Sequence, residues 1–330
     1  MKVLFIGGTG NISTATSRLA VERGIDLYLL NRGKSTLKVR GAKSIVGDIN
    51  APEQLESTLA GHQWDVVVNW IAFTKEEIER DIKLFAGKTK QYIFISSASA
   101  YQKPATHYLI TESTPLFNPF WQYSRDKIAC EDALMSAYRT DGFPMTIVRP
   151  SHTYDTVIPV ALGGWGEYNI VDRLRKGKKI IVHGDGTSLW TLTHSDDFAI
   201  GFVGLLGHPK AIGHAFHITS DDVLSWNQVY EGLADAVGVA PNIVHIPSDF
   251  ICQHWPDQTG NLLGDKAHSA VFDNTKIKTF VPEFKATIPF HQGIRRTLGW
   301  LEADPSRQVI NPETEKELDK IVEKYQQHGQ

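Results

Sequence analysis

The sequence predicts an α/β protein built on a doubly wound parallel sheet, with a smaller and less regular region towards the C-terminus. Short apolar runs alternate with helical patterns through the first 150 residues. A glycine-rich turn follows the first of these runs, and the alternation weakens after Pro150, where Gly, Pro and Trp become frequent. Strands that alternate with helices at this spacing form right-handed βαβ units, and these units give a parallel sheet.

Each predicted strand is a continuous apolar run, which is typical of parallel strands buried on both faces. The runs lie at residues 3–6, 27–30, 44–46, 64–69, 92–95 and 145–148. Helical spacing fills the gaps at residues 14–23, 51–60, 75–85 and 123–138. Residues 179–182 and 214–218 are further strand candidates, expected to complete the same sheet. The polar tail, residues 312–330, is expected to be a solvent-facing helix.

Composition excludes several classes of protein. The 330 residues are 42% hydrophobic and 22% charged, which is ordinary globular usage and excludes a disordered, collagen-like or coiled-coil chain. The net charge of -3 lacks the basic excess of a general nucleic-acid binder, so no nucleic-acid partner is expected. No run of 18 apolar residues exists, and Cys130 and Cys252 cannot build a disulfide framework. We therefore expect a cytoplasmic protein without a membrane partner.

The turn Gly7-Gly8-Thr9-Gly10 lies between the first strand and the first helix. Gly7 permits a tight turn, and Gly10 lets the backbone approach a pyrophosphate. The helix that starts beyond Asn11 and Ile12 supplies N–H groups and the positive end of its dipole. A turn that merely needs glycines is the alternative. The position of the turn favours a Rossmann-type dinucleotide site, and residues 1–150 are assigned to that domain.

The end of the second strand indicates which dinucleotide is bound. An acidic residue there would bind the ribose hydroxyl of NAD, whereas an arginine accommodates the 2′-phosphate of NADP. This chain has Asn31 and Arg32, with no acid. We therefore expect NADP, with NAD as the alternative and a purely solvated Arg32 as the other interpretation.

Tyr123 and Lys127 lie four residues apart, so a helix places both on one face. A tyrosine works as a general acid or base when its pKa is lowered, and a neighbouring ammonium group has that effect. Ser97, at the end of the fifth strand, is the natural third member because its hydroxyl can bind the reacting oxygen. The three residues are predicted to be catalytic.

With these motifs the chain resembles an extended short-chain dehydrogenase/reductase of the NAD(P)-dependent epimerase/dehydratase family. The resemblance spans roughly residues 1–300. It rests on the glycine turn, on Gly47-Asp48-Ile49, on residues 95–101, on Tyr123 with Lys127, and on Arg149-Pro150.

The resemblance implies further roles. Asp48 and Ile49 would hold the adenine, and Pro150 and His152 would lie beside the nicotinamide. Lys127 would also hold the nicotinamide ribose. Residues 75–85 and 123–138 would form the helix bundle of a homodimer. The segment 69–72 would line the dinucleotide, and it contributes Trp70, Ile71 and Ala72.

Departures from the family bear on the substrate. Ala98-Ser99 replaces the Asp-Glu pair of the dehydratases, and Trp190 stands where sugar-nucleotide epimerases usually carry an arginine. An aromatic ring stacks on a sugar but cannot neutralise a phosphate. Residues 151–330 are taken as mainly the substrate region, and a sugar-like substrate that does not depend on a diphosphate is predicted. The substrate residues proposed from the sequence are Ser99, Trp165, Tyr168 and Trp190.

Several alternatives stay open. A nucleotide sugar could be held by the basic run at residues 173–179, although a solvated helix end also explains that run. Epimerase and ketoreductase share the same triad. A non-catalytic dinucleotide- or RNA-binding protein, like the chloroplast stem-loop-binding proteins, is the alternative from another class.

No metal site is predicted, because His214 and His217 face opposite sides of a strand. Asp196-Asp197 is interpreted as a helix cap.

Overall fold

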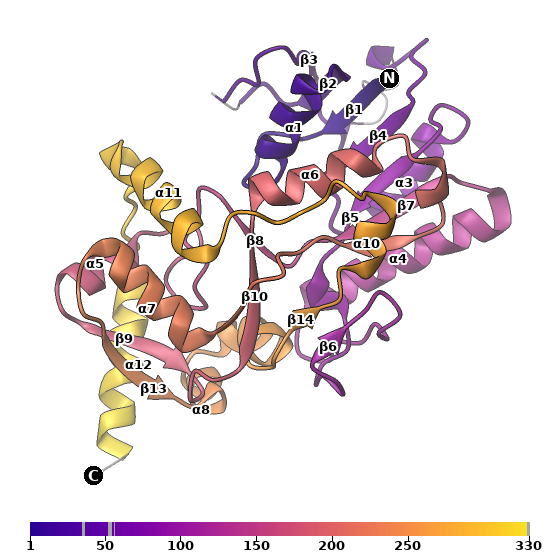
Figure 1. Cartoon of the computed structure of the whole chain (residues 1–330). Helices are drawn as coiled ribbons and strands as arrows, with labels where there is room; N and C mark the ends of the chain where they lie inside the picture. The colour runs from indigo at the N-terminus through magenta and orange to yellow at the C-terminus, as the bar shows by residue number, and fades with distance from the viewer. Residues whose placement is uncertain (35–36, 52–54, 56, 329–330) are drawn as a thin grey trace.

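The computed structural model describes residues 1–34, 37–51, 55 and 57–328. In that part of the chain, seven parallel strands form the main sheet in the order β11-β7-β5-β4-β1-β2-β3 (Figure 1). The strand order reverses beside β1, so the sheet is doubly wound and the predicted fold class is confirmed. The strands are β1 (Lys2–Ile6), β2 (Asp26–Asn31), β3 (Lys43–Val46), β4 (Val66–Asn69), β5 (Tyr92–Ile95), β7 (Met145–Arg149) and β11 (Ala215–His217).

Helices cover both faces of this sheet. Val3 and Phe5 of β1 point to the cluster that holds α1 (Ser13–Glu22) and α6 (Ser195–Leu205). Leu4 and Ile6 point the other way, to α3 (Lys75–Phe85) and α4 (Gln122–Asp141). The alternation explains why the strand sequences are apolar throughout. The helix expected at residues 51–60 falls in part outside the described residues.

Most of the remaining elements form the second region, on the left and lower part of Figure 1. Its small sheets join β8 (His152–Tyr154), β10 (Leu189–His194) and β12 (Val223–Ser225), then β9 (Lys179–His183) with β13 (Asn242–Ile246), and β6 (Leu109–Ile110) with β14 (Val271–Phe272). Its helices are α5 (Asn169–Arg175), α7 (Trp226–Val237), α8 (Ser248–His254), α9 (Thr259–Asn261), α11 (Phe290–Glu302) and α12 (Pro312–His328). The helix α10 (Thr275–Phe280) packs instead against α6 and β11 of the main sheet. No helix among the described residues has the length and apolar character needed to span a bilayer.

The two strand candidates after residue 150 belong to different sheets. Residues 214–218 supply β11, which pairs with β7 and extends the main sheet as expected. Residues 179–182 supply β9, which pairs with β13 instead. The expectation that both complete the main sheet is therefore wrong for residues 179–182, because β9 forms a separate two-stranded sheet with β13.

The C-terminal helix is also not simply solvent-facing. Leu318, Ile321 and Val322 of α12 are buried in the core of the second region, because their helical spacing puts them on one face. On the same helix, Glu315 and Asp319 each accept a 2.7 Å hydrogen bond from Arg173 of α5. Arg173 is buried and Lys178 pairs with the same two carboxylates, so these two residues anchor the basic run to α12, while Arg175 and Lys176 are exposed to solvent as expected.

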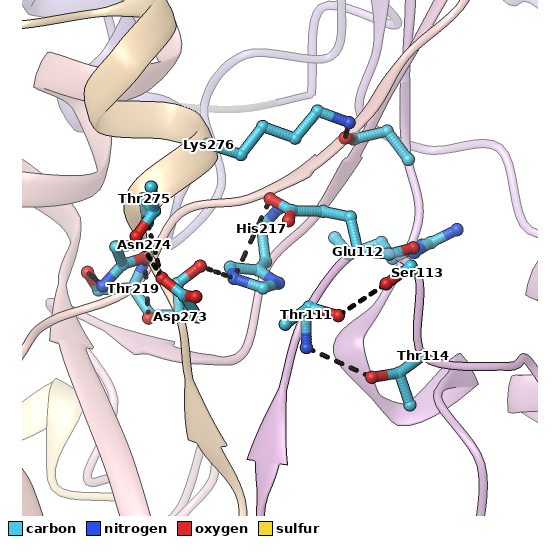
Figure 2. A network of polar contacts seen from close by, with 12 residues as sticks. Thr111, Glu112, Ser113, Thr114, His217, Thr219, Asp273, Asn274, Thr275 and Lys276 are labelled. Carbon is cyan, nitrogen blue, oxygen red and sulfur yellow. Dashed lines mark hydrogen bonds and ion pairs between the residues drawn. The ribbon is translucent and has the colours of Figure 1, made fainter.

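A buried polar network fixes the edge strand β11 to the second region, and Figure 2 shows its members around His217. His217 Nε2 lies 2.8 Å from the carbonyl oxygen of Asp273, and its Nδ1 lies 3.0 Å from the Tyr101 hydroxyl. Its backbone N–H donates to Glu112. Since Nε2 must donate to a carbonyl, Nδ1 accepts from Tyr101, and burial keeps the ring neutral by lowering its pKa. The network therefore joins the ends of β6, β11 and β14.

Candidate active site

The glycine turn lies where the strand order reverses, between β1 and α1. Gly7 and Gly8 have φ values of +92° and +103°, and a Cβ on Gly8 would lie 2.7 Å from Leu29 Cδ2. The fold itself needs these two glycines. Gly10 is different, because its φ is not positive and a Cβ there would meet only Ser13 Oγ at 3.5 Å. The absent side chain at Gly10 therefore leaves room for a ligand.

The start of α1 suits an anion. Ile12 occupies the N-cap and no side chain caps the helix. Thr14 donates its N–H to the carbonyl oxygen of Gly10, and the other N–H groups of the first turn remain available. Backbone amides at a helix N-terminus, next to a glycine without a structural need, fit the pyrophosphate of a dinucleotide.

Asn11 has a different role from the one predicted. Its Nδ2 donates to the carbonyl oxygen of Thr153 at 2.9 Å, and its Oδ1 accepts from the N–H groups of Asp155 and Thr156. Its own carbonyl oxygen accepts from Ser195 Oγ. The side chain is thus committed to protein contacts that hold the glycine turn against the segment after β8, and only its backbone stays available to a cofactor.

The predicted triad comes together in one cavity of about 810 Å³. Ser97 follows β5 and caps the short helix η1 (Ala98–Ala100), while Tyr123 and Lys127 lie on the first two turns of α4. Lys127 Nζ is buried and donates to the carbonyl oxygens of Ala72 at 2.7 Å and Ile95 at 2.9 Å. The lysine is therefore held in place by the ends of β4 and β5.

The protonation states differ from the sequence-based expectation. Burial raises the pKa of Tyr123 above its usual value, and a hydrogen bond with Ser97 opposes that rise only in part. Burial lowers the pKa of Lys127 to about 8. The expected lowering of the tyrosine pKa by lysine is thus not found, because the ammonium is bonded to two carbonyls and does not offset the desolvation of the phenol. At neutral pH Tyr123 is protonated, and it can donate a proton.

Sequence reasoning missed Ser124, which supports the triad. Its hydroxyl donates to Ser99 Oγ at 2.8 Å, and Ser99 Oγ lies 2.9 Å from Ser97 Oγ. Ser99 is buried, with its hydroxyl shared between these two serines. It therefore acts on Ser97 more directly than on a substrate. The only sequence signal for Ser124 is its place next to Tyr123 on the same helix turn.

Most of the predicted residues reach the cavity, and some do not. Those that line it are Gly10, Asn11, Ile12, Trp70, Ile71, Ser97, Ser99, Tyr123, Lys127, Pro150, His152 and Trp165. Those outside it are Gly7, Asn31, Arg32, Asp48, Ile49, Ala72, Tyr168 and Trp190. Arg32 is exposed at the end of β2, and Asp48 accepts the N–H of Asn50. An adenosine held by these residues would lie outside the cavity, along the edge of the sheet.

The prediction that Tyr168 and Trp190 bind the substrate is wrong, because both are core residues. Trp190, on β10, is 2% exposed and packs on Trp226 with ring centroids 5.5 Å apart. Tyr168 is buried at the start of α5 and donates to Glu302 at 3.1 Å. In an irregular region, a large aromatic residue has the same sequence signature whether it fills the core or lines a cavity.

The far wall of the cavity was missed by sequence reasoning. The described residues from this wall include Trp121, Trp255, Asp257, Gln258, Asn261, Asp265, Lys266, Glu167 and Thr314. A signal did exist, because Asp257, Asn261 and Asp265 recur every four residues and therefore share one helical face. This wall adds two indole rings, amides and carboxylates to the triad.

Two further features are the possible metal ligands and the cap of α6. The described residues hold no group of three or more His, Cys, Asp or Glu side chains that could bind a metal ion. At the start of α6 the cap is His194, whose side chain accepts the N–H of Asp196. Asp197 instead accepts the N–H groups of Thr287 and Ile288, so the interpretation of the acidic pair as the cap is wrong.

Comparison with known proteins agrees with this geometry. The chain is 25% identical over 263 residues to the 2'-dehydrokanamycin reductase of Streptomyces kanamyceticus, covering 78% of this chain and 72% of that protein. It is 28% identical over 265 residues to the chloroplast stem-loop binding protein of 41 kDa b from Arabidopsis thaliana, covering 76% and 67% of the two chains.

Among solved structures, the UDP-glucose 4-epimerase of Bifidobacterium longum, in complex with NAD+ and UDP, has the same fold. The TM-score is 0.73 at 19% identity, covering 93% of this chain and 100% of that one. The family model described as the NAD dependent epimerase/dehydratase family matches residues 3–219, which include the glycine turn and the triad. The chain therefore belongs to the NAD-dependent epimerase/dehydratase family.

Proposed function

We propose that this protein is an NADP-dependent oxidoreductase, or an epimerase, that acts on a hydroxyl- or keto-bearing carbon of a sugar-like substrate. Ser97, Tyr123 and Lys127 are its catalytic residues. The observation that carries the proposal is their meeting in one cavity with Gly10, the glycine that the fold does not require. The family and its reductase and epimerase relatives supply the reaction class.

The residues have distinct roles in carbonyl reduction. A bound nicotinamide supplies the hydride, which the carbonyl carbon receives. Tyr123 gives its proton to the carbonyl oxygen, so that ketone, hydride and proton together form the alcohol. Ser97 donates a hydrogen bond to the same oxygen. Lys127, which the carbonyl oxygens of Ala72 and Ile95 hold in place, is proposed to bind the nicotinamide ribose, and proton transfer runs the other way in oxidation.

The cofactor contacts follow from the fold. Gly10 and the N–H groups at Ile12 suit the phosphates, while Trp70 and Ile71 line the dinucleotide path. Arg32 is proposed to hold the 2′-phosphate of NADP, and no ion pair occupies it among the described residues. Asn31, Asp48 and Ile49 are proposed to border the adenosine, and Pro150 and His152 the nicotinamide.

A reductase and an epimerase with this site differ in the fate of their cofactor. An epimerase regenerates its cofactor in each turnover and retains it, whereas a reductase releases it. We expect the purified protein to carry less than one dinucleotide per chain, measured by chromatography after denaturation. Full occupancy would favour the epimerase.

The catalytic assignment is tested by Tyr123→Phe. Oxidation of NADPH is measured with a panel of keto sugars, both free and nucleotide-linked. The variant should bind NADPH normally and lose ~10²–10⁴-fold of the turnover rate, which is the usual contribution of general acid–base catalysis. Tyr108→Phe, at an exposed tyrosine outside the cavity, is the control. A rate within a factor of two of the parent protein would remove Tyr123 from the mechanism.

RNA binding is the second candidate, favoured by the similarity to the chloroplast stem-loop binding protein. With a net charge of -3, the protein lacks the excess of positive charge that attracts an RNA backbone. We expect no shift of a stem-loop RNA in a gel at physiological salt. A shift at that salt which survives in Tyr123→Phe would support the second candidate. The proposed homodimer through α3 and α4 is tested separately by sedimentation.

A further inference from the structure

The charges on the far wall of the cavity are unusual for a protein that binds an anionic substrate. Among the described lining residues there is no arginine, and the cationic side chains are Lys127 and Lys266. The carboxylates there are Glu167, Asp257 and Asp265. A phosphate or diphosphate is normally held by arginine or lysine, often through paired hydrogen bonds.

Both lysines are already engaged. Lys127 donates to two backbone carbonyls beneath Tyr123. Lys266 is 8% exposed and donates to Asn261 Oδ1 at 2.7 Å and to Asp265 Oδ2 at 3.3 Å. The charge of Asp265 is therefore balanced within the protein, and neither ammonium group is left over for an anion.

The negative charges of Glu167 and Asp257 are not balanced by a neighbouring cation in this way. Glu167 Oε1 accepts from two neutral donors, Asn311 Nδ2 at 2.7 Å and Thr314 Oγ1 at 2.9 Å. These bonds orient the carboxylate and leave its charge in place. Asp257 is exposed to the cavity and has no cation within ion-pairing distance among the described residues. The nearby ring of His152 is neutral at pH 7, since burial lowers its pKa well below the usual value.

Aromatic rings complete this wall. Trp165 lies two residues before Glu167 and is 55% exposed, and Trp255 lies two residues before Asp257. Indole faces stack on the apolar face of a sugar ring and also attract ammonium groups. An indole beside an unbalanced carboxylate thus occurs twice in the cavity, once on the loop after residue 162 and once after α8.

We propose that the substrate of this site is cationic: a polyhydroxylated ring compound with at least one protonated amino group, which Glu167 and Asp257 bind. The inference rests on the proposed function, because it concerns the same cavity, and it adds the charge of the substrate. A nucleoside-diphosphate sugar is disfavoured, since its phosphates would face two carboxylates without a free cation.

The test compares ligands of different charge, two of which share the same disaccharide backbone. The disaccharide of β-1,4-linked glucosamine carries two amino groups, and its di-N-acetylated form carries none. Binding of each, and of UDP-glucose, is measured by calorimetry with NADP+ present at saturation, at 20 and at 200 mM salt. We expect the amine to bind about fivefold to tenfold more tightly than the acetylated form. The difference should shrink at high salt.

Variants assign the effect to the two carboxylates. Glu167→Gln retains the acceptor for Asn311 and Thr314 and removes only the charge, and Asp257→Asn does the same at an exposed position. Each should weaken amine binding about threefold to tenfold and leave the acetylated form unchanged. Glu313→Gln, at an exposed carboxylate outside the cavity, is the matched control and should change neither.

The outcomes separate this inference from the proposed function. Equal or tighter binding of the acetylated sugar or of UDP-glucose overturns the inference, as does a failure of the amine to bind while NADP+ still binds. If a neutral or nucleotide-linked keto sugar is reduced and Tyr123→Phe abolishes that reaction, the proposed function stands without the inference. If the amine binds as expected but no turnover depends on Tyr123, the proposed function is the one that fails.

Discussion

Gly10 lies at a position where the fold tolerates a side chain and a bound dinucleotide would not. A Cβ at this position meets only the Ser13 hydroxyl at an ordinary contact distance, while a Cβ at Gly8 collides with Leu29. Gly10→Ala should therefore keep or slightly raise thermal stability, since alanine reduces the entropy of the unfolded chain. It should weaken dinucleotide binding at least about tenfold, because the added methyl occupies the approach of the phosphates.

The control for this prediction is Gly8→Ala. It should destabilise the protein whether or not a dinucleotide is present, because φ is +103° and Leu29 lies within 2.7 Å. Calorimetry with NADP and thermal melting without it distinguish the two variants. Normal dinucleotide affinity in Gly10→Ala would contradict the assignment of Gly10 to the cofactor.

Lys127 predicts a pH dependence of stability. Its pKa is about 8 in the folded protein, against 10.5 in the unfolded chain, so its burial costs about 3 kcal/mol at neutral pH. The unfolded chain binds more protons between these two values, and this contribution therefore stabilises the fold as pH rises from about 8 to 10.5. In urea denaturation, the free energy of unfolding of the wild type should rise relative to Lys127→Met between pH 7.5 and pH 9.5. A constant difference between them would contradict the buried state of the lysine.

At the residue scale, the meeting of Ser97, Tyr123 and Lys127 in one cavity was predictable from the sequence because spacing on a helix and position at a strand end are local properties. The pKa of Tyr123 was not, since it depends on how deeply α4 packs against η1. The clamp made by Asn11 was also beyond the sequence, because its partners lie more than 140 residues away. The misassignment of Trp190 has the same cause, as burial on β10 is a property of the tertiary structure.

At the element scale, the central strands β1, β4, β5 and β7 were predictable because both faces of each are buried and their sequences are mostly apolar, whereas the edge strand β3 is largely exposed. The second region has shorter strands in small sheets, and their pairing is set by distant segments. The strand β9 illustrates this, since its sequence fits the main sheet while its partner is β13. The apolar stripe on α12 was visible in the sequence, but the overall polarity of the tail hid it.

The attachment of α12 to α5 yields a second stability prediction. Arg173→Ala removes a buried guanidinium. Lys178 then remains as the cation that pairs with Glu315 and Asp319. Removing one partner of a fully buried pair costs ~3–5 kcal/mol, and about 2–3 kcal/mol is expected here because the carboxylates are partly exposed. Arg175→Ala breaks a half-exposed pair with Glu302 and should cost at most about 1 kcal/mol. Equal losses for both variants in urea denaturation would show that α12 is not anchored by Arg173.

At the scale of the whole molecule, the cavity is lined by both regions, so a ligand within it should stabilise the entire chain. A ligand present at 100 times its dissociation constant adds about 2.7 kcal/mol to the free energy of unfolding. If Arg32 recognises the 2′-phosphate, NADP should raise the melting temperature more than NAD at equal concentration. Arg32→Ala should abolish the difference, and Arg139→Ala on α4 should not. A larger shift with NAD in the parent protein would reverse the cofactor assignment.

The residues that line the two walls of the cavity come largely from different parts of the sequence. The glycine turn and the triad lie within residues 3–219, the segment that the family model matches, whereas Trp255, Asp257, Asn261 and Thr314 lie beyond it. The proposed substrate residues are divided between the two stretches, because Glu167 lies inside the matched segment and Asp257 lies beyond it. Exchange of the last third of the protein would therefore change one of the two proposed carboxylates and leave Glu167 and Tyr123 in place.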